Sequence, residues 1–213
     1  TLDRIVARHE NLRTVFVQGM EGPVQSIAPQ TAGFALAEED LSSLAGEARE
    51  QALRGRVTDE ARAPFDLSRG PLIRGRLIRL AEQEHALLLT QHHIVSDGWS
   101  IGVLVREMTA LYEACTAGKD DPLPALPIQY ADYAVWQRNW LHGDALQAQL
   151  DFWKGHLGGA PTLLELPTDR PRPLMQSHAG AVVPLSLPKA TGEGLRLLSK
   201  RHGTTLFMTL MAG

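Results

Sequence analysis

Two adjacent histidines, an aspartate and a glycine are the residues of this chain whose types and spacing could support chemistry. His92, His93, Asp97 and Gly98 lie within the segment QHHIVSDGWS at 91–100. An imidazole exchanges protons near neutral pH, a carboxylate pairs with a cation, and a glycine lets a substrate approach the backbone closely. An apolar run precedes the group and a helical pattern follows it, which predicts a junction between a strand and a helix.

Three interpretations of this group compete. Successive strand residues point to opposite faces, and no other His or Cys stands at a familiar zinc spacing, so we expect no metal. A structural junction would have His92 packed, Asp97 capping the helix and Gly98 easing the turn. A catalytic site would place one histidine in a substrate tunnel and pack the other, with Asp97 fixing the turn.

The elements that position the group are predicted from their patterns. The segment HALLLTQHHIV at 85–95 is apolar on both alternating faces, which is typical of a strand covered on both sides. Apolar residues then recur at three- and four-residue steps from Ile101 to Cys115, which predicts an amphipathic helix with Cys115 in the core. The segment LIRGRLIRL at 72–80 is a further predicted strand.

The rest of the chain predicts a mixed α/β class with a mixed or largely antiparallel sheet. We expect a turn at Asn11, a strand from Leu12, and a mainly helical stretch at 128–156 with Trp136, Trp140 and Trp153 in the core. Further strands are expected within 22–29, 34–41 and 181–187, an irregular stretch at 166–180, and helices at 43–63, 189–203 and from 204 onward.

Composition limits the function classes. The 213 residues carry a net charge of −3, which gives no electrostatic footprint for nucleic acid or an anionic membrane. One cysteine permits no internal disulfide, and no apolar run approaches the roughly 20 residues that span a bilayer. These features fit a cytoplasmic protein. The chain begins like the middle of a helix and ends in an apolar segment, so we expect a fragment of a longer protein.

Five segments together resemble the condensation domains of nonribosomal peptide synthetases. QHHIVSDGWS resembles their active-site signature, and RHENLRTVF at 8–16 resembles their early Arg-His-Glu-x-Leu-Arg-Thr-x-Phe motif. The segments YADYAVWQ at 130–137, PFDLSRGPLIRGRLIRL at 64–80 and LPTDRPRP at 166–173 also fit, in family order. The resemblance implies a fold like chloramphenicol acetyltransferase, with two lobes in a V and a tunnel between them. Residues 1–203 would form a truncated N-terminal lobe and 204–213 the start of the C-terminal lobe.

The resemblance also implies an activity. A donor acyl or peptidyl thioester on one carrier would be attacked by the α-amine of an aminoacyl thioester on another. Both substrates would hang on phosphopantetheine arms of upstream and downstream peptidyl carrier domains, beside an adenylation domain, with no cofactor bound directly. Epimerization, acyl transfer without carriers, and a non-catalytic recruitment platform are the alternatives. The order Trp99-Ser100 disfavours epimerization, and the retained histidine pair disfavours a platform.

By this resemblance, His93 faces the tunnel and Gly98 allows close approach, with its backbone N–H as a candidate oxyanion donor. His92 and Asp97 are expected to be structural, with Arg74 or Arg13 as candidate partners of Asp97 unless that partner lies in the missing lobe. Arg13 is expected to brace the lobe near the tunnel. Ser96 lacks an evident activating base, so we assign it no chemistry, and His9 is expected to stabilise a turn.

Overall fold

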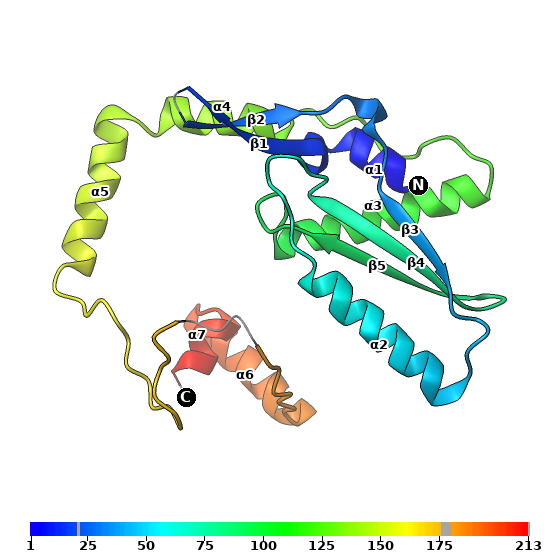
Figure 1. Ribbon diagram of the computed structural model, residues 1–213. Helices are drawn as coiled ribbons and strands as arrows, with labels where there is room; N and C mark the ends of the chain where they lie inside the picture. The colour runs from blue at the N-terminus through cyan, green and yellow to red at the C-terminus, as the bar shows by residue number, and fades with distance from the viewer. Residues whose placement is uncertain (21, 176–179, 213) are drawn as a thin grey trace. The chain divides into compact units, whose positions relative to one another are not determined.

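The structure is a computed structural model that describes residues 1–20, 22–175 and 180–212. It divides into two compact units, Thr1–Gly158 and Gly159–Gly213, which are described separately. The first unit contains the histidine pair and a three-stranded sheet (Figure 1).

The sheet consists of β3 (Leu36–Asp40), β4 (Ile73–Ala81) and β5 (Glu84–Gln91), in that order. β4 pairs parallel with β3 and antiparallel with β5, so the expected mixed sheet is confirmed. The expectation that β5 is covered on both faces is wrong, because none of its residues is buried and Leu87 is 39% exposed. β4 is the strand that is buried, since it has a neighbour on each side and helices on both faces.

Helices cover the two faces of the sheet. α2 (Gly46–Arg62) packs on one face, where Ile78 and Leu80 form a core cluster with Leu41. α1 (Leu2–Arg8) and α3 (Gly98–Thr116) pack on the other face (Figure 1). The main core cluster is contributed by α1, β4, α3 and the segments between them; it contains Ile5, Val6, Leu12, Leu72, Ile73, Val95, Leu104 and Leu111.

The amphipathic helix predicted after Gly98 is confirmed as α3, but its buried face is offset from the expected one. Leu104, Leu111 and Ala114 are buried, whereas Cys115 is exposed. One residue turns a helix by about 100°, so the neighbour of a buried position can leave the core. The prediction that Cys115 belongs to the core is therefore wrong.

A short 3-10 helix, η1 (Glu10–Arg13), follows α1 and leads into a hairpin of β1 (Thr14–Gly19) and β2 (Gly22–Ile27). The first strand begins at Thr14 rather than at Leu12, because the 3-10 turn directs Leu12 into the core. A second short 3-10 turn, η2 (Gln30–Ala32), connects the hairpin to β3.

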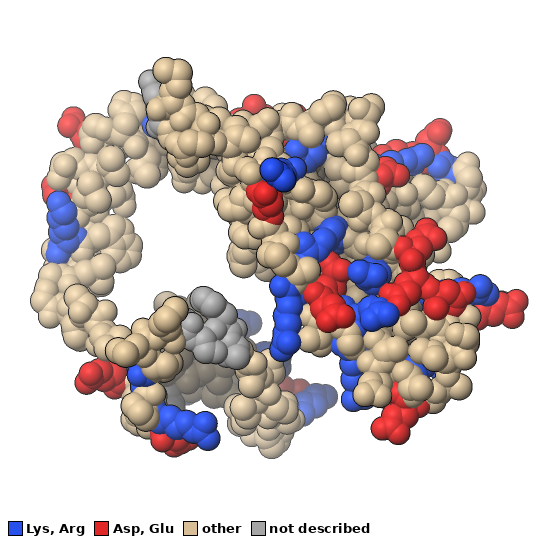
Figure 2. Space-filling model, viewed as in Figure 1, with Lys and Arg blue, Asp and Glu red and all other residues tan. Residues whose placement is uncertain are grey.

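An ion-pair network fastens α2 to the sheet. Glu60 of α2 accepts from Arg74 Nε at 2.6 Å and lies 3.7 Å from Arg76 Nε. Arg56 of α2 binds both carboxylate oxygens of Glu39 at 2.8 Å. Acidic and basic side chains therefore alternate over this part of the face shown in Figure 2, rather than forming a patch of one sign.

α4 (Tyr130–Trp140) and α5 (Gly143–Leu157) confirm the mainly helical stretch. Its tryptophans are not core residues, which corrects the prediction: Trp136, Trp140 and Trp153 are 55%, 55% and 52% exposed. The aromatic rings of α4 stack on one another instead, with the centroids of Trp136 and Trp140 5.8 Å apart. Helical spacing shows which residues share a face, but it does not show what covers that face.

The second unit contains α6 (Lys189–His202) and α7 (Leu206–Met211), as predicted. The hydroxyls of Ser199 and Thr209 join these helices at 2.7 Å. The strand expected at 181–187 is wrong: these residues are irregular, because no ladder partner lies beside them in the described part of the unit. Residues 176–179 of the predicted irregular stretch, which include His178, lie outside the described residues.

Candidate active site

The histidine pair lies in a six-residue turn between the end of β5 at Gln91 and the start of α3 at Gly98. Two backbone hydrogen bonds shape the beginning of this turn. His92 N donates to Leu72 O at 2.9 Å, which ties the turn to the start of β4, and Val95 N donates to His92 O at 3.1 Å. The Ser96 hydroxyl also points back to His92 O, at 3.5 Å. The predicted junction of strand and helix is thus present.

The ring of His92 makes one hydrogen bond and one aromatic contact. Its Nδ1 accepts from the backbone N–H of Ile94 at 3.0 Å, so the lone pair of that nitrogen is occupied. The ring meets Phe65 edge-on, with centroids 5.7 Å apart. The guanidinium of Arg74 in turn lies 4.0 Å from the centre of the Phe65 ring. His92 is half-buried by these contacts.

His93 and Gly98, by contrast, are both exposed. Gly98 is the first residue of α3, and the N–H groups of a first helical turn have no partner within the helix. Its backbone is not in the left-handed region, and a Cβ placed on it would meet no atom within 4 Å. The conformation and packing of this chain therefore do not require a glycine at this position.

Asp97 caps α3. Its Oδ1 accepts from Ser100 N at 2.8 Å and from the Ser100 hydroxyl at 2.6 Å. The hydroxyl bond, followed by the backbone bond, lowers the pKa of Asp97, and the charge of His93 contributes in the same direction.

Neither candidate arginine partner reaches Asp97 in the described structure. Arg74 binds Glu60, and its guanidinium also donates to Ala63 O at 2.6 Å. The side chain of Arg13 is only 7% exposed and binds Ala28 O and Glu10. Arg74 contacts the site indirectly, because it lies against the ring of Phe65 that touches His92.

The sequence did not indicate a role for Asn11, yet this residue reaches the turn. Asn11 Nδ2 donates to Val95 O at 2.6 Å, across 84 residues of sequence. His9 beside it bonds Glu107 of α3 at 2.6 Å instead of stabilising only its own turn. Gln129 binds both Arg8 O and Glu10 N and so ties the start of α4 to η1. Contacts of such long range have no local sequence signature.

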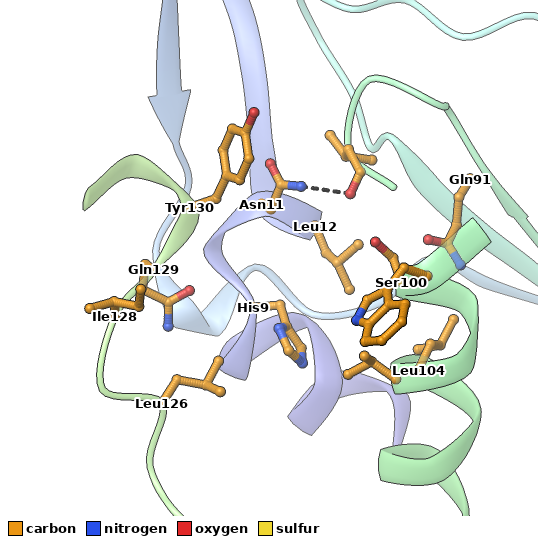
Figure 3. Close-up of a pocket in the computed structure, with 13 residues that line it drawn as sticks. His9, Asn11, Leu12, Gln91, Ser100, Leu104, Leu126, Ile128, Gln129 and Tyr130 are labelled. Atoms are coloured by element: carbon orange, nitrogen blue, oxygen red, sulfur yellow. Dashed lines mark hydrogen bonds between the residues drawn. The ribbon is translucent and has the colours of Figure 1, made fainter. Parts of the chain in front are cut away.

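A cavity of about 300 Å³ lies against this turn (Figure 3). Gln91 lines it from before the turn and Ser100 from after it, while His9, Asn11 and Gln129 line it from the opposite side. Leu12, Leu104 and Ile128 make much of its surface apolar. Within the described ranges, no group of three or more His, Cys, Asp and Glu side chains is placed to hold a metal ion.

The family model of the condensation domain matches residues 1–213. The chain belongs to the condensation domain family. It is 48% identical over 212 residues to one of the linear gramicidin synthase proteins of Brevibacillus parabrevis and 50% identical over 213 residues to malpibaldin synthetase of Mortierella alpina. Each alignment covers all of this chain but only 3% and 4% of those two proteins. The chain is therefore similar to a small part of much longer synthetases.

The chain is also similar in structure to the solved X-domain from teicoplanin biosynthesis. The TM-score is 0.80 at 32% identity, over 96% of this chain and 44% of that one. The same X-domain has been solved in complex with OxyB. The chain thus has the fold of one lobe of a condensation domain. In the described part of this lobe, no helix combines the length and apolar character needed to cross a membrane.

Proposed function

We propose that this chain carries the catalytic histidine of a domain that forms amide bonds in nonribosomal peptide synthesis. The observation that carries the proposal is the contrast between the two histidines in the signature of a condensation domain. His92 is held by Phe65 and a backbone N–H, whereas His93 is exposed and has no comparable contact among the described residues.

The reaction joins two carrier-bound substrates. The α-amine of the acceptor attacks the thioester carbonyl carbon of the donor, so a C–N bond forms and the C–S bond breaks. The ammonium proton of the tetrahedral intermediate passes to His93, which then gives it to the departing thiolate of the donor arm. A free α-amine has a pKa of about 7.7–8.0, so much of it is already neutral near pH 7.5. His93 therefore acts chiefly by orienting the amine and then accepting its proton.

Gly98 and Asp97 serve the same step in different ways. The exposed Gly98 leaves room for the thioester, and its N–H points from the helix start toward the developing oxyanion. Asp97 holds the first turn of α3 through its bonds to Ser100. His92 supports the site directly, Arg74 supports it through Phe65, and Arg13 braces the lobe through Ala28 O and Glu10. The phosphopantetheine arms of the partner carrier domains deliver the substrates, and the matching adenylation domain loads them.

A second candidate function is binding of a partner protein, because the similar X-domain has been solved in complex with OxyB. The histidine pair discriminates between catalysis and partner binding, because a recruitment platform has no chemical reason to keep it. Epimerization would use the same histidine on one substrate, and it would change the α-carbon configuration without joining two carriers. The isolated 213-residue chain is expected to be inactive under every catalytic alternative, because the tunnel implied by the family lies between two lobes.

The test uses the complete parent synthetase with donor and acceptor carriers loaded by its own adenylation domains. Intact-protein mass spectrometry follows dipeptide on the acceptor carrier for wild type, His93→Ala and a matched control, His85→Ala, which replaces an exposed histidine of β5. We expect His93→Ala to lose about 10²–10⁴-fold in rate and His85→Ala to match wild type. Equal rates for the two variants would overturn the role of His93, and an inactive wild type would overturn condensation.

A further inference from the structure

We infer that Asn11 is a positioning residue for His93, and this inference rests on the proposed function. Asn11 occupies the unspecified position of the Arg-His-Glu-x-Leu-Arg-Thr-x-Phe motif, so the family resemblance assigns it no role. Its amide nevertheless reaches the turn that presents His93 and donates to Val95 O at 2.6 Å (Figure 3).

The turn at 92–97 has few hydrogen bonds to the rest of the protein in the described structure. Its first residue is fixed by the bond from His92 N to Leu72 O. Other hydrogen bonds, such as that from Ile94 N to His92 Nδ1, run within the turn. Among the described residues, Asn11 provides the only side-chain hydrogen bond into the turn from a distant element. His93 therefore lies between two anchors, His92 on one side and Val95 on the other.

Asn11 itself stands on a rigid support. Its neighbour Leu12 is buried in the main core cluster, and the Thr14 hydroxyl closes η1 by donating to Glu10 O at 2.7 Å. At the other end of the bond, the Val95 side chain is only 3% exposed. The Asn11 amide thus joins two fixed parts of the lobe. Without this donor, Val95 O would lose a short hydrogen bond.

Loss of this bond should move His93 more than it unfolds the lobe. Val95 would keep its apolar packing, while the backbone between His92 and Val95 would gain freedom. A shift of about 1 Å in a catalytic group can cost about 10²-fold in rate. We therefore expect kcat for dipeptide formation to fall about 10- to 100-fold in Asn11→Asp, which keeps the shape of the side chain, removes the donor and adds a carboxylate charge beside Val95 O. KM for the loaded acceptor carrier should stay within about twofold, because binding of the carrier is not altered.

The experiment is a double-mutant cycle in the complete parent synthetase, with Asn11→Asp measured in the wild-type and His93→Ala backgrounds. An effect that acts through His93 should disappear in the His93→Ala background. Asn139→Asp is the matched control, since it makes the same substitution at an exposed position of α4. Asn11→Ser, a smaller and uncharged change that shortens the reach of the donor, serves if Asn11→Asp fails to fold.

Each outcome separates this inference from the proposed function. A lower kcat in the wild-type background only, at unchanged melting temperature, supports Asn11 as a positioning residue. An equal loss in both backgrounds would show a general structural role and overturn the inference, as would a rate equal to that of Asn139→Asp. If wild type transfers and His93→Ala does not, the proposed function stands in either case. If the wild type forms no dipeptide on the acceptor carrier, both the inference about Asn11 and the proposed function are overturned.

Discussion

At the scale of single residues, His92 and His93 acquire different surroundings although they are identical and adjacent. The sequence predicted this difference from strand alternation, with one ring packed and the other free. β5 ends at Gln91, however, so both histidines lie in the turn. Their difference comes from specific contacts instead: Ile94 N and Phe65 hold His92, and no comparable contact holds His93 in the described structure. The strand predicted at 85–95 therefore ends before the pair, and strand alternation does not explain the difference between the two histidines.

The capping bond of Asp97 leads to a pH-dependent prediction for stability. The Ser100 hydroxyl lowers the pKa of Asp97, so the folded state binds that proton less readily than the unfolded state. The carboxylate therefore stabilises the fold fully above the ordinary carboxyl pKa, and this stabilisation is lost as the pH falls through the lowered pKa. Asp97→Ala should lower the melting temperature by a few degrees at pH 7.

Calorimetry of the parent protein at several pH values measures this effect. The difference between Asp97→Ala and wild type should shrink as the pH drops below about 4. Asp144→Ala, at an exposed position in the first turn of α5, is the control. A difference that stays constant across this range would show that the cap does not depend on the charge of Asp97.

At the scale of elements, the sequence predicted the strand, turn and helix that form the junction, because their apolar periods differ clearly. It did not predict which strand is central in the sheet, since β4 carries arginines at positions where a buried strand would be apolar. Those arginines are accommodated because Glu60 and Glu39 pair with them beneath α2. The ion-pair partner of Arg74, Glu60, was also beyond prediction, because it depends on which elements pack together.

Glu60 should therefore matter to the attachment of α2. Its side chain is 9% exposed and faces both Arg74 and Arg76. Glu60→Ala would leave Arg74 without its carboxylate and Arg76 with Glu39 alone, and we expect a loss of about 2–3 kcal/mol in the free energy of unfolding. Glu50→Ala, which breaks the exposed pair with Arg54 on the same helix, should cost less than about 1 kcal/mol. Urea unfolding of both variants tests this, and similar losses would contradict the proposed importance of the network.

At the scale of the whole molecule, the chain corresponds to 44% of the similar X-domain chain and to a few per cent of its synthetase relatives. The family, the fold class and the lobe could be recognised from the five motifs, because all five occur in this chain in the order that they have in the family. The coverage of the aromatic face of α4 could not be predicted, because periodicity does not identify what packs against a face. Trp136 and Trp140 show this most clearly.

The isolated 213-residue chain provides a prediction at this scale. With loaded carriers added in trans, we expect no dipeptide from the chain alone, while the complete parent domain produces it under the same conditions. The physical reason is that the site proposed at the 92–98 turn needs a second wall to hold two thioesters in reacting distance. Turnover by the isolated chain at a rate comparable to the parent would show that one lobe contains the whole site.

The most direct test of the account is the rate of dipeptide formation by Gly98→Ala in the parent synthetase. A methyl group at Gly98 meets no protein atom within 4 Å and its backbone is not left-handed, so the variant should fold with wild-type stability. The same is true of the control, Gly55→Ala in α2. If substrates approach the backbone beside His93, Gly98→Ala should lose about 10- to 100-fold in rate while Gly55→Ala loses nothing. A fully active Gly98→Ala would show that the reaction does not take place at the turn between β5 and α3.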